Sequence, residues 1–165
     1  MQNSNFKYPD TAAFNFVVEH LESRGVELRE LSNLAYEMQK DFAELGTPDE
    51  YYEALIDVLH KRELLNDAMV ALELDRLAQT NQLAEPLLSI VKNDAGVFGA
   101  DEALALGIAN IYGTIGVTNY GYLDRVKKDV IKRFDENDDQ VATFIDDILG
   151  AIVAAVCGKM AHRYA

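Results

Sequence analysis

Two adjacent carboxylates, Asp146 and Asp147, stand in the most apolar part of the chain, between Phe144-Ile145 and Ile148-Leu149-Gly150. Burying even one carboxylate without a partner is strongly unfavourable, and metal binding is the economical explanation for a buried pair. Adjacent helical positions point about 100° apart. The pair would therefore bind one ion with help from another element, or divide between ligand and general-base roles. The alternative is that both carboxylates cap a helix or pair with Lys and Arg of a neighbouring helix.

A second acidic pair, Asp101 and Glu102, precedes a run without charge from Ala103 to Leu123. In one interpretation, these acids only stabilise the first turn of a helix, where the amides and the helix dipole favour negative charge. In the other, Glu102 helps to complete an oxygen-rich site for Mg²⁺, together with Asn110 two turns later on the same face.

Between the two acidic pairs lies a glycine-rich run, residues 112–121, with the sequence Tyr-Gly-Thr-Ile-Gly-Val-Thr-Asn-Tyr-Gly. Glycine permits positive φ and a close approach of the backbone, and Thr and Asn add hydrogen-bonding side chains. The run lacks the Gly-Lys-Ser/Thr of a Walker loop and has no dinucleotide fingerprint. We interpret it as a loop that suits a phosphate group; the alternative is an ordinary glycine-rich turn that links two helices. Its predicted substrate-binding residues are Gly113, Thr114, Gly116, Thr118 and Asn119.

Two groups of basic residues could assist a phosphorylated substrate. Lys61 and Arg62 could close over the phosphate, or they could pair with Glu63 and Asp67 at the surface. The segment of residues 124–135 carries five of the 15 bases, enough to hold phospholipid headgroups at a membrane surface. The alternative for this segment is a solvated helix face whose bases are balanced by its own acids.

The elements that must position these side chains are helical, because apolar residues recur at three- and four-residue spacings nearly throughout. Thr47-Pro48-Asp49-Glu50 is a strong start signal, with a capping Thr, a Pro at the first helical position and a Glu that completes a capping box. A second helix should end only at Gly46, with Phe42 facing inward. The predicted helices cover residues 11–23, 28–46, 48–60, 60–78, 86–92, 103–112 and about 138–162.

The last of these helices is apolar on every side from Val141 to Cys157, except at Asp146 and Asp147. A helix that is hydrophobic all round is a buried one. We therefore predict an all-α fold, a multi-helical bundle with a central buried C-terminal helix. The run of residues 103–123 is long enough to cross a membrane, but its four glycines and two asparagines favour a buried helix followed by a loop. No transmembrane segment is predicted.

The composition bounds the class of protein. A length of 165 residues with 49% hydrophobic residues predicts one compact soluble domain over residues 1–165. The lone Cys157 excludes an intramolecular disulfide, and the N-terminus has no secretion signal, so we expect a cytoplasmic protein. The net charge of −13 argues against nucleic acid as a partner. Residues 1–102 hold 20 acids and 8 bases, a net of −12, so the last 63 residues are nearly neutral.

The motifs in this nearly neutral part resemble the phosphatidylglycerophosphatase A family, and more closely its soluble, all-helical branch in Gram-positive bacteria. The family carries a Pro-Gly-Thr-x-Gly-Ser motif, which residues 112–117 match with Tyr for Pro and Val for Ser. It also carries an Asp-Pro-x-x-x-Val-x-Asp-Glu-x-x-Gly motif. Asp139-Gln140 and residues 146–150 match that motif at the same spacing, with Gln for Pro and Asp for Glu. Residues 99–102 and 118–124 look like the soluble branch, and the resemblance covers about residues 99–164.

The resemblance implies Mg²⁺-dependent hydrolysis of the phosphomonoester of phosphatidylglycerophosphate, which gives phosphatidylglycerol. On this interpretation Asp146 and Asp147 are catalytic and, with Glu102, bind Mg²⁺. The expected partner is a phosphorylated substrate, with a phospholipid headgroup at the inner membrane face as one form of it. Two alternatives stay open: a phosphatase of a soluble phosphomonoester, and a non-catalytic helical protein that binds a phosphorylated metabolite or a protein partner. A homo-oligomer also stays open.

Overall fold

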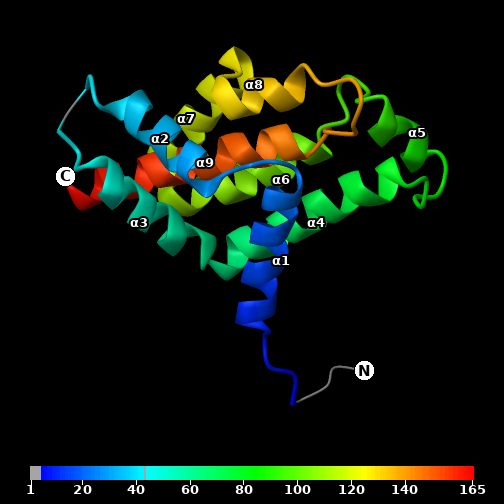
Figure 1. The fold of residues 1–165 in the computed structure, drawn as a ribbon, viewed down its shortest axis with the longest axis horizontal. Helices are drawn as coiled ribbons and strands as arrows, with labels where there is room; N and C mark the ends of the chain where they lie inside the picture. Colours follow the sequence, from blue (N-terminus) through cyan, green and yellow to red (C-terminus); the bar gives the residue numbers. More distant parts are fainter. Residues whose placement is uncertain (1–4, 43) are drawn as a thin grey trace.

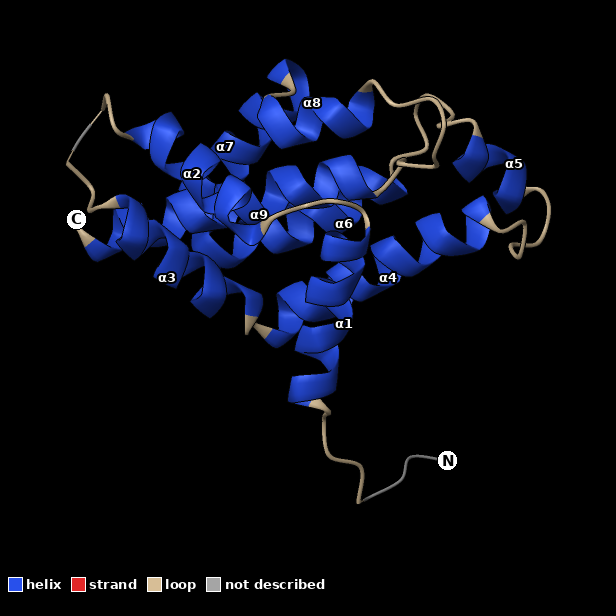
Figure 2. Ribbon diagram, viewed as in Figure 1, coloured by secondary structure: helices blue, strands red, loops and turns tan. Residues whose placement is uncertain are grey.

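The computed structural model describes residues 5–42 and 44–165 (Figure 2). Within these ranges it contains nine α-helices, one short 3-10 helix and no strand, which confirms the all-α prediction. Residues 1–4 and 43 lie outside the described residues, and the single domain over residues 1–165 stays a prediction. The elements in chain order are α1 (Asp10–Ser23), α2 (Leu28–Gln39), α3 (Pro48–Leu59), α4 (Arg62–Gln79), α5 (Leu87–Lys92), α6 (Ala100–Ala109), η1 (Asn110–Tyr112), α7 (Gly113–Val126), α8 (Asp129–Asp135) and α9 (Ile145–Arg163).

The C-terminal helix α9 runs through the middle of the molecule, with α2, α3, α6, α7 and α8 packed around it (Figure 1). Every residue from Ile145 to Gly158 is buried. A helix that is apolar on all sides gains the most free energy when neighbours cover it all round. The prediction of a central buried C-terminal helix is therefore confirmed.

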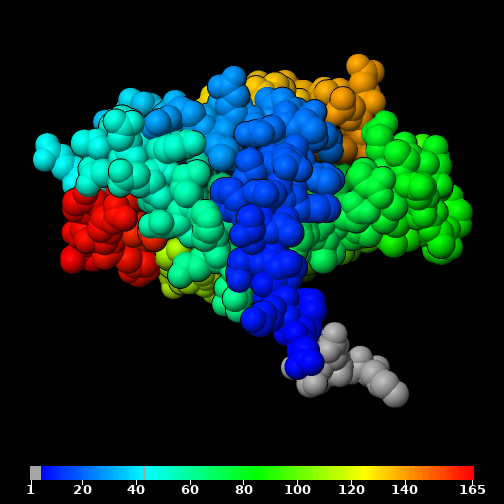
Figure 3. Space-filling model, turned by 60° about the horizontal axis from the view of Figure 1, so that its bottom comes forward, coloured from blue at the N-terminus to red at the C-terminus, as the bar shows by residue number. Residues whose placement is uncertain are grey.

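The N-terminal helices pack on the outside of this centre. In the space-filling view, α1 lies at the surface between α3 on one side and α4 and α5 on the other (Figure 3). The start of α3 has the predicted capping box: Thr47 Oγ1 accepts from the Glu50 amide at 3.3 Å, and Glu50 Oε2 accepts from the Thr47 amide at 2.7 Å. These reciprocal bonds satisfy amides that the helix itself leaves unpaired.

Two helix boundaries differ from the sequence prediction. The second helix, α2, ends at Gln39 instead of Gly46, and Phe42 is 87% exposed instead of facing inward. The last helix begins at Ile145 instead of about residue 138. Residues before it form local turns, in which Asn137 Oδ1 accepts from the Asp139 amide at 3.0 Å. Asn and Asp favour such turns over helix because their side chains compete for backbone groups.

The predicted glycine-rich loop is wrong, because residues 113–126 form the helix α7. Thr118 Oγ1 donates to the carbonyl of Thr114 at 2.9 Å, and Asn119 Nδ2 donates to that of Ile115 at 2.8 Å, both within the helix. The charge-free run of residues 103–123 is thus divided between α6 and α7. In the described part of the chain, no helix combines the length and the apolar character needed to cross a membrane.

Glycine is required in α7 for packing. A Cβ at Gly116 would lie 2.1 Å from the backbone oxygen of Ala109, and a Cβ at Gly158 of α9 would lie 3.3 Å from the Gly116 amide nitrogen. These glycines let α7 approach both the end of α6 and the middle of α9. Close approach of this kind brings more atoms into contact than larger residues would allow.

We predict that Gly116→Ala lowers the free energy of unfolding by about 1–3 kcal/mol, because the added methyl group displaces backbone atoms instead of a mobile side chain. Urea unfolding followed by circular dichroism measures the change.

The matched control is Gly121→Ala on the same helix. Gly121 is exposed and a Cβ there meets nothing within 4 Å. We expect this variant to gain about 0.5–1 kcal/mol, because Ala has the higher helix propensity. Equal stabilities of the two variants would contradict the packing role of Gly116.

Candidate functional site

A pocket of about 220 Å³ opens at the first turn of α9. Its walls come from the loop of residues 94–98, the first turn of α6, the ends of α7 and α8, and the first turn of α9. We call it the acidic pocket, because its ionisable lining residues in the described structure are seven acids and one lysine. They are Asp94, Asp101, Glu102, Asp124, Asp135, Asp146, Asp147 and Lys127.

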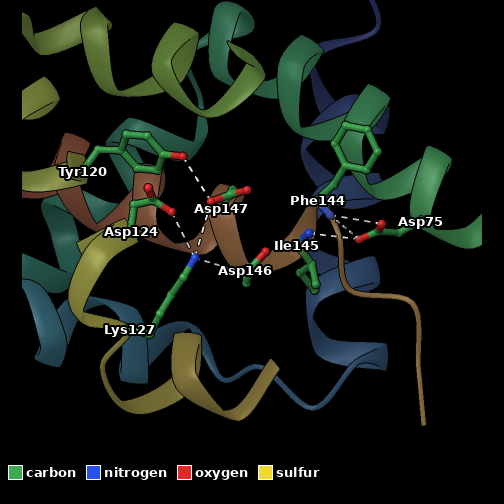
Figure 4. A network of polar contacts seen from close by, with 8 residues as sticks. All are labelled: Asp75, Tyr120, Asp124, Lys127, Phe144, Ile145, Asp146 and Asp147. Atoms are coloured by element: carbon green, nitrogen blue, oxygen red, sulfur yellow. Dashed lines mark hydrogen bonds and ion pairs between the residues drawn. The ribbon is translucent and has the colours of Figure 1, made fainter. Parts of the chain in front are cut away.

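The ammonium of Lys127 lies where three of these carboxylates converge (Figure 4). Its Nζ donates to Asp146 Oδ2 at 2.9 Å and to Asp124 Oδ1 at 3.1 Å, and it lies 3.6 Å from Asp147 Oδ1. Asp147 Oδ1 also accepts from the hydroxyl of Tyr120 at 3.1 Å. One lysine thus serves both carboxylates of the adjacent pair. This pairing corresponds in part to the alternative of the sequence analysis, although a single cation faces three acids.

Burial dominates the electrostatics of the adjacent pair. Asp146 is 8% exposed and Asp147 is 5% exposed. Burial raises the pKa of Asp147, the neighbouring charge of Asp146 raises it further, and Lys127 opposes both effects. Burial likewise raises the pKa of Asp146 against the effect of Lys127. For Lys127 itself, burial disfavours the charged form, but the surrounding carboxylates outweigh it and raise its pKa. The carboxylates around Lys127 therefore carry more negative charge than its single ammonium balances.

The two acids of α6 face the same pocket. Asp101 is 6% exposed, and its Oδ1 has no hydrogen-bond partner in the described structure. The Oε2 of Glu102 is buried and equally lacks a partner there. The neighbouring carboxyl of Asp101 and, secondly, burial raise the pKa of Glu102, so a proton held between the two carboxyls is one way to satisfy these oxygens. Buried oxygens without a donor are rare in folded proteins, and such oxygens are places where a proton, a water molecule or a cation can bind.

The donor set of the acidic pocket fits Mg²⁺, because carboxylate oxygens are the ligands that this ion prefers. The unpartnered oxygens of Asp101 and Glu102 support the same conclusion. The described side chains are not, however, arranged as metal ligands in this structure. Among the described residues, no three His, Cys, Asp or Glu side chains are grouped so that they could hold a metal ion as they stand. Lys127 instead occupies the point between Asp124, Asp146 and Asp147.

The first turn of α9 is capped by an acid from another helix. Asp75 of α4 is fully buried, and its carboxylate accepts from the amide of Ile145 at 2.9 Å and from that of Phe144 at 3.1 Å (Figure 4, right). Burial raises the pKa of Asp75 to about 7, against the lowering effects of these amide bonds and of Arg24. Asp75 thereby pairs with amides that would lack an acceptor at the start of the helix that carries Asp146 and Asp147.

The segment before α9 is held by the first half of the chain. The carbonyl of Val141 accepts from Arg24 Nη2 at 2.9 Å, and its amide donates to Gln79 Oε1 at 2.6 Å. Thr143 Oγ1 donates to the carbonyl of Val91 at 2.6 Å. These bonds fix residues 141–143 against α4, α5 and the end of α1.

The structure does not place Lys61 or Arg62 in the acidic pocket. Arg62 forms a two-point ion pair with Asp10 of α1, at 2.7 and 2.8 Å, and lies over the ring of Tyr8. Among the side chains described, its partner is therefore Asp10 instead of Glu63 or Asp67. A substrate-binding role for Lys61 and Arg62 stays a prediction.

The predicted phosphate-binding residues also lie outside the acidic pocket. Gly113, Thr114, Gly116, Thr118 and Asn119 belong to the first two turns of α7, whereas the end of that helix reaches the pocket. Their role in substrate binding stays a prediction, without the loop on which it was based. Asp146, Asp147 and Glu102 line one pocket, and their catalytic and metal-binding roles stay a prediction.

Sequence reasoning missed Asp75 and the inward position of Lys127. Asp75 had a detectable signal, since it falls on the apolar stripe of α4 with Leu72 and Ala78. Lys127 had none, because the basic segment around it has the pattern of a solvated helix face. Its orientation depends on the turn between α7 and α8, where Lys127 has a positive φ of 46°.

These features define an all-helical protein whose central helix carries two adjacent carboxylates into a buried acidic pocket. The phosphatidylglycerophosphatase A family matches residues 17–162, and the chain belongs to this family. The match extends the resemblance found in residues 99–164 over most of the chain. Membership of this family implies a phosphatase.

Relatives share the fold over nearly their whole length. The chain is 42% identical to the Bacillus subtilis protein YutG over 144 residues, which are 87% of each chain. It matches the solved structure of a Bacillus stearothermophilus protein of unknown function with a TM-score of 0.87 and 39% identity, over 98% of both chains. The low temperature requirement C protein from Listeria monocytogenes matches with a TM-score of 0.86 and 37% identity, over 96% of this chain and 98% of that one.

We predict that Asp75→Ala lowers the free energy of unfolding by about 2–4 kcal/mol, because buried amides lose their acceptor at about 1–3 kcal/mol each. Urea unfolding measures the change. Glu63→Ala, an exposed acid on the same helix, is the control and should change the stability by less than about 0.5 kcal/mol. Equal losses in the two variants would contradict the capping role.

The cost of Asp75→Ala should depend on pH. The pKa of Asp75 is about 7 in the folded protein and about 3.9 in the unfolded chain. A raised acid pKa means that the folded state binds the proton more tightly, so the stabilising contribution is lost as pH rises through the folded value. The difference between wild type and Asp75→Ala should therefore be larger at about pH 5 than at about pH 8. A difference that grows with pH would contradict the assignment.

Proposed function

We propose that the protein is a Mg²⁺-dependent phosphomonoesterase that hydrolyses phosphatidylglycerophosphate, or a phosphomonoester of similar headgroup chemistry. The observation that carries this proposal is the acidic pocket at the first turn of α9, in a chain of the phosphatidylglycerophosphatase A family. The pocket contains the carboxylates of the family motif, Asp146 and Asp147, together with the unpartnered oxygens of Asp101 and Glu102.

Mg²⁺ would be held by Asp146, Asp147 and Glu102, with Asp101 and Asp124 on the same walls as further oxygen ligands. When bound, the ion supplies positive charge that offsets the charge of the phosphate oxygens in the transition state. Without such charge the pocket would repel a phosphate, because its acids outnumber its one lysine in the described residues.

The chain's own residues have two further tasks in this reaction. Asp146 and Asp147 point in different directions from adjacent helical positions, so one can serve as a ligand while the other accepts the proton of the attacking water. Tyr120 holds Asp147 from the side of α7 at 3.1 Å, and Asp75 fixes the backbone from which both carboxylates project. Rigid support of this kind keeps the proton acceptor in place.

A lipid headgroup fits the surface beside the pocket. At the end of α7, Tyr122 is 45% exposed and Val126 is 43% exposed, and Arg125 is exposed as well. The Nζ of Lys128 lies over the ring of Tyr122. Exposed aromatic and cationic side chains next to Asp124 and Lys127 suit contact with an anionic membrane surface at the inner face of the membrane.

We expect purified protein with Mg²⁺ to release phosphate from phosphatidylglycerophosphate in mixed micelles, and chelation of the metal to abolish the release. Asp147→Asn should lower the rate by at least about 100-fold, because it removes a metal ligand or the proton acceptor. Asp138→Asn, an exposed acid before α9, is the control and should keep the wild-type rate.

A panel of soluble phosphomonoesters assayed in parallel separates the substrate classes. Faster release from a soluble ester would assign a soluble substrate instead of the lipid. No release from any substrate would contradict the enzyme and support a binding protein.

A further inference from the structure

Lys127 is the sole cationic side chain among the described residues that line the acidic pocket. Its side chain is 19% exposed. Its ammonium lies near the carboxylates of Asp124, Asp146 and Asp147. These three acids are among the residues that would hold Mg²⁺ in the proposed function. A lysine ammonium and a metal ion compete for one set of carboxylates, because like charges repel and both bind to the same acceptors.

The backbone at Lys127 is strained. Its φ of 46° lies in the left-handed region, as does that of Asp129 two residues later at 48°. Non-glycine residues in this region are unfavourable, and such strain persists only when other contacts compensate for it. At Lys127 the compensating contacts are its ion pairs with the pocket acids.

The ammonium leaves the pocket short of positive charge. Asp101 is almost wholly buried with an unpartnered Oδ1, and the buried Oε2 of Glu102 also has no donor. Lys127 does not reach these α6 acids with any hydrogen bond or ion pair found among the described residues. It therefore stabilises one side of the pocket and leaves the α6 side unsatisfied, which a divalent cation between the two sides would correct.

We propose that Lys127 is a tethered competitor of the metal: its ammonium holds Asp124, Asp146 and Asp147 while the pocket is free of metal, and it must leave them when a divalent cation binds. This inference rests on the proposed metal-dependent function. It adds that metal affinity is set by an exchange of cations, and that the metal-free pocket is kept folded by its own lysine. The joint between α7 and α8, at Lys127 and Lys128, is where the backbone can relax during the exchange.

The test is metal binding by Lys127→Met, measured by isothermal titration calorimetry with Mg²⁺ and with Mn²⁺. We expect this variant to bind the metal at least about tenfold more tightly than wild type, since no ammonium has to be displaced. Its metal-free melting temperature should be lower than that of wild type, because three acids lose their counterion. Saturating Mg²⁺ should raise its melting temperature more than it raises that of wild type.

Two control variants test whether a change in metal affinity comes from the ammonium of Lys127. Lys127→Arg retains the charge and should bind metal with near wild-type affinity. Lys128→Met removes the neighbouring charge, which contacts Tyr122 and no pocket acid, and should also bind like wild type. If Lys127→Met does not fold without metal, Lys127→Gln gives the same comparison.

The possible outcomes separate the two proposals. Metal binding by Lys127→Met that is no tighter than in wild type would overturn the competition and leave the metal site standing. An equal gain in metal affinity in Lys128→Met would overturn the competition too, because loss of any nearby positive charge would then explain the gain. Absence of metal binding in wild type and in every variant would overturn the metal site and the competition together.

Discussion

The first turn of α9 concentrates buried negative charge at the start of a helix that is otherwise apolar. Asp75 lies against its amides, and Asp146 and Asp147 project from its side, all nearly excluded from water. Because water reaches these carboxylates so little, each needs a partner from a neighbouring helix. The amides of α9 are partners for Asp75, whereas Lys127 and Tyr120 are partners for the other two acids. The surrounding helices are therefore constrained by charge as well as by apolar packing.

Scaffold and site are the same element in this fold. The helix that forms most of the core also carries the motif carboxylates, and the helices that pack on it supply the other pocket residues from their ends. Gly116 and Gly158 allow α7 to lie close to α9, which brings the end of α7 with Asp124 to the pocket. Gly116 of the family motif acts here through helix packing, and the contribution of α7 to the pocket comes from its last turn.

The sequence allowed the central helix, the capping box at Thr47 and the grouping of Glu102 with the adjacent aspartates to be predicted. These depend on local composition or on motif order. The glycine-rich run predicts a loop because glycine lowers helix propensity. Packing against Ala109 and α9 outweighs this low propensity, and the run forms a helix. Asp75 and Lys127 could not be assigned their partners from local pattern. One contact spans about 70 residues of chain, and the other depends on a turn with positive φ.

The hydrogen bonds around residues 141–143 have a consequence for how this site can evolve. Arg24, Gln79 and Val91 hold the segment that leads into α9, and all three belong to the part of the chain that carries none of the family motifs. A substitution of Arg24 or Gln79 would leave both motifs intact yet remove a hydrogen bond that holds the segment before the central helix. Relatives with identical motifs can thus differ in the shape of the pocket. Divergence in substrate preference within the family should be sought in the N-terminal helices as much as in the motifs themselves.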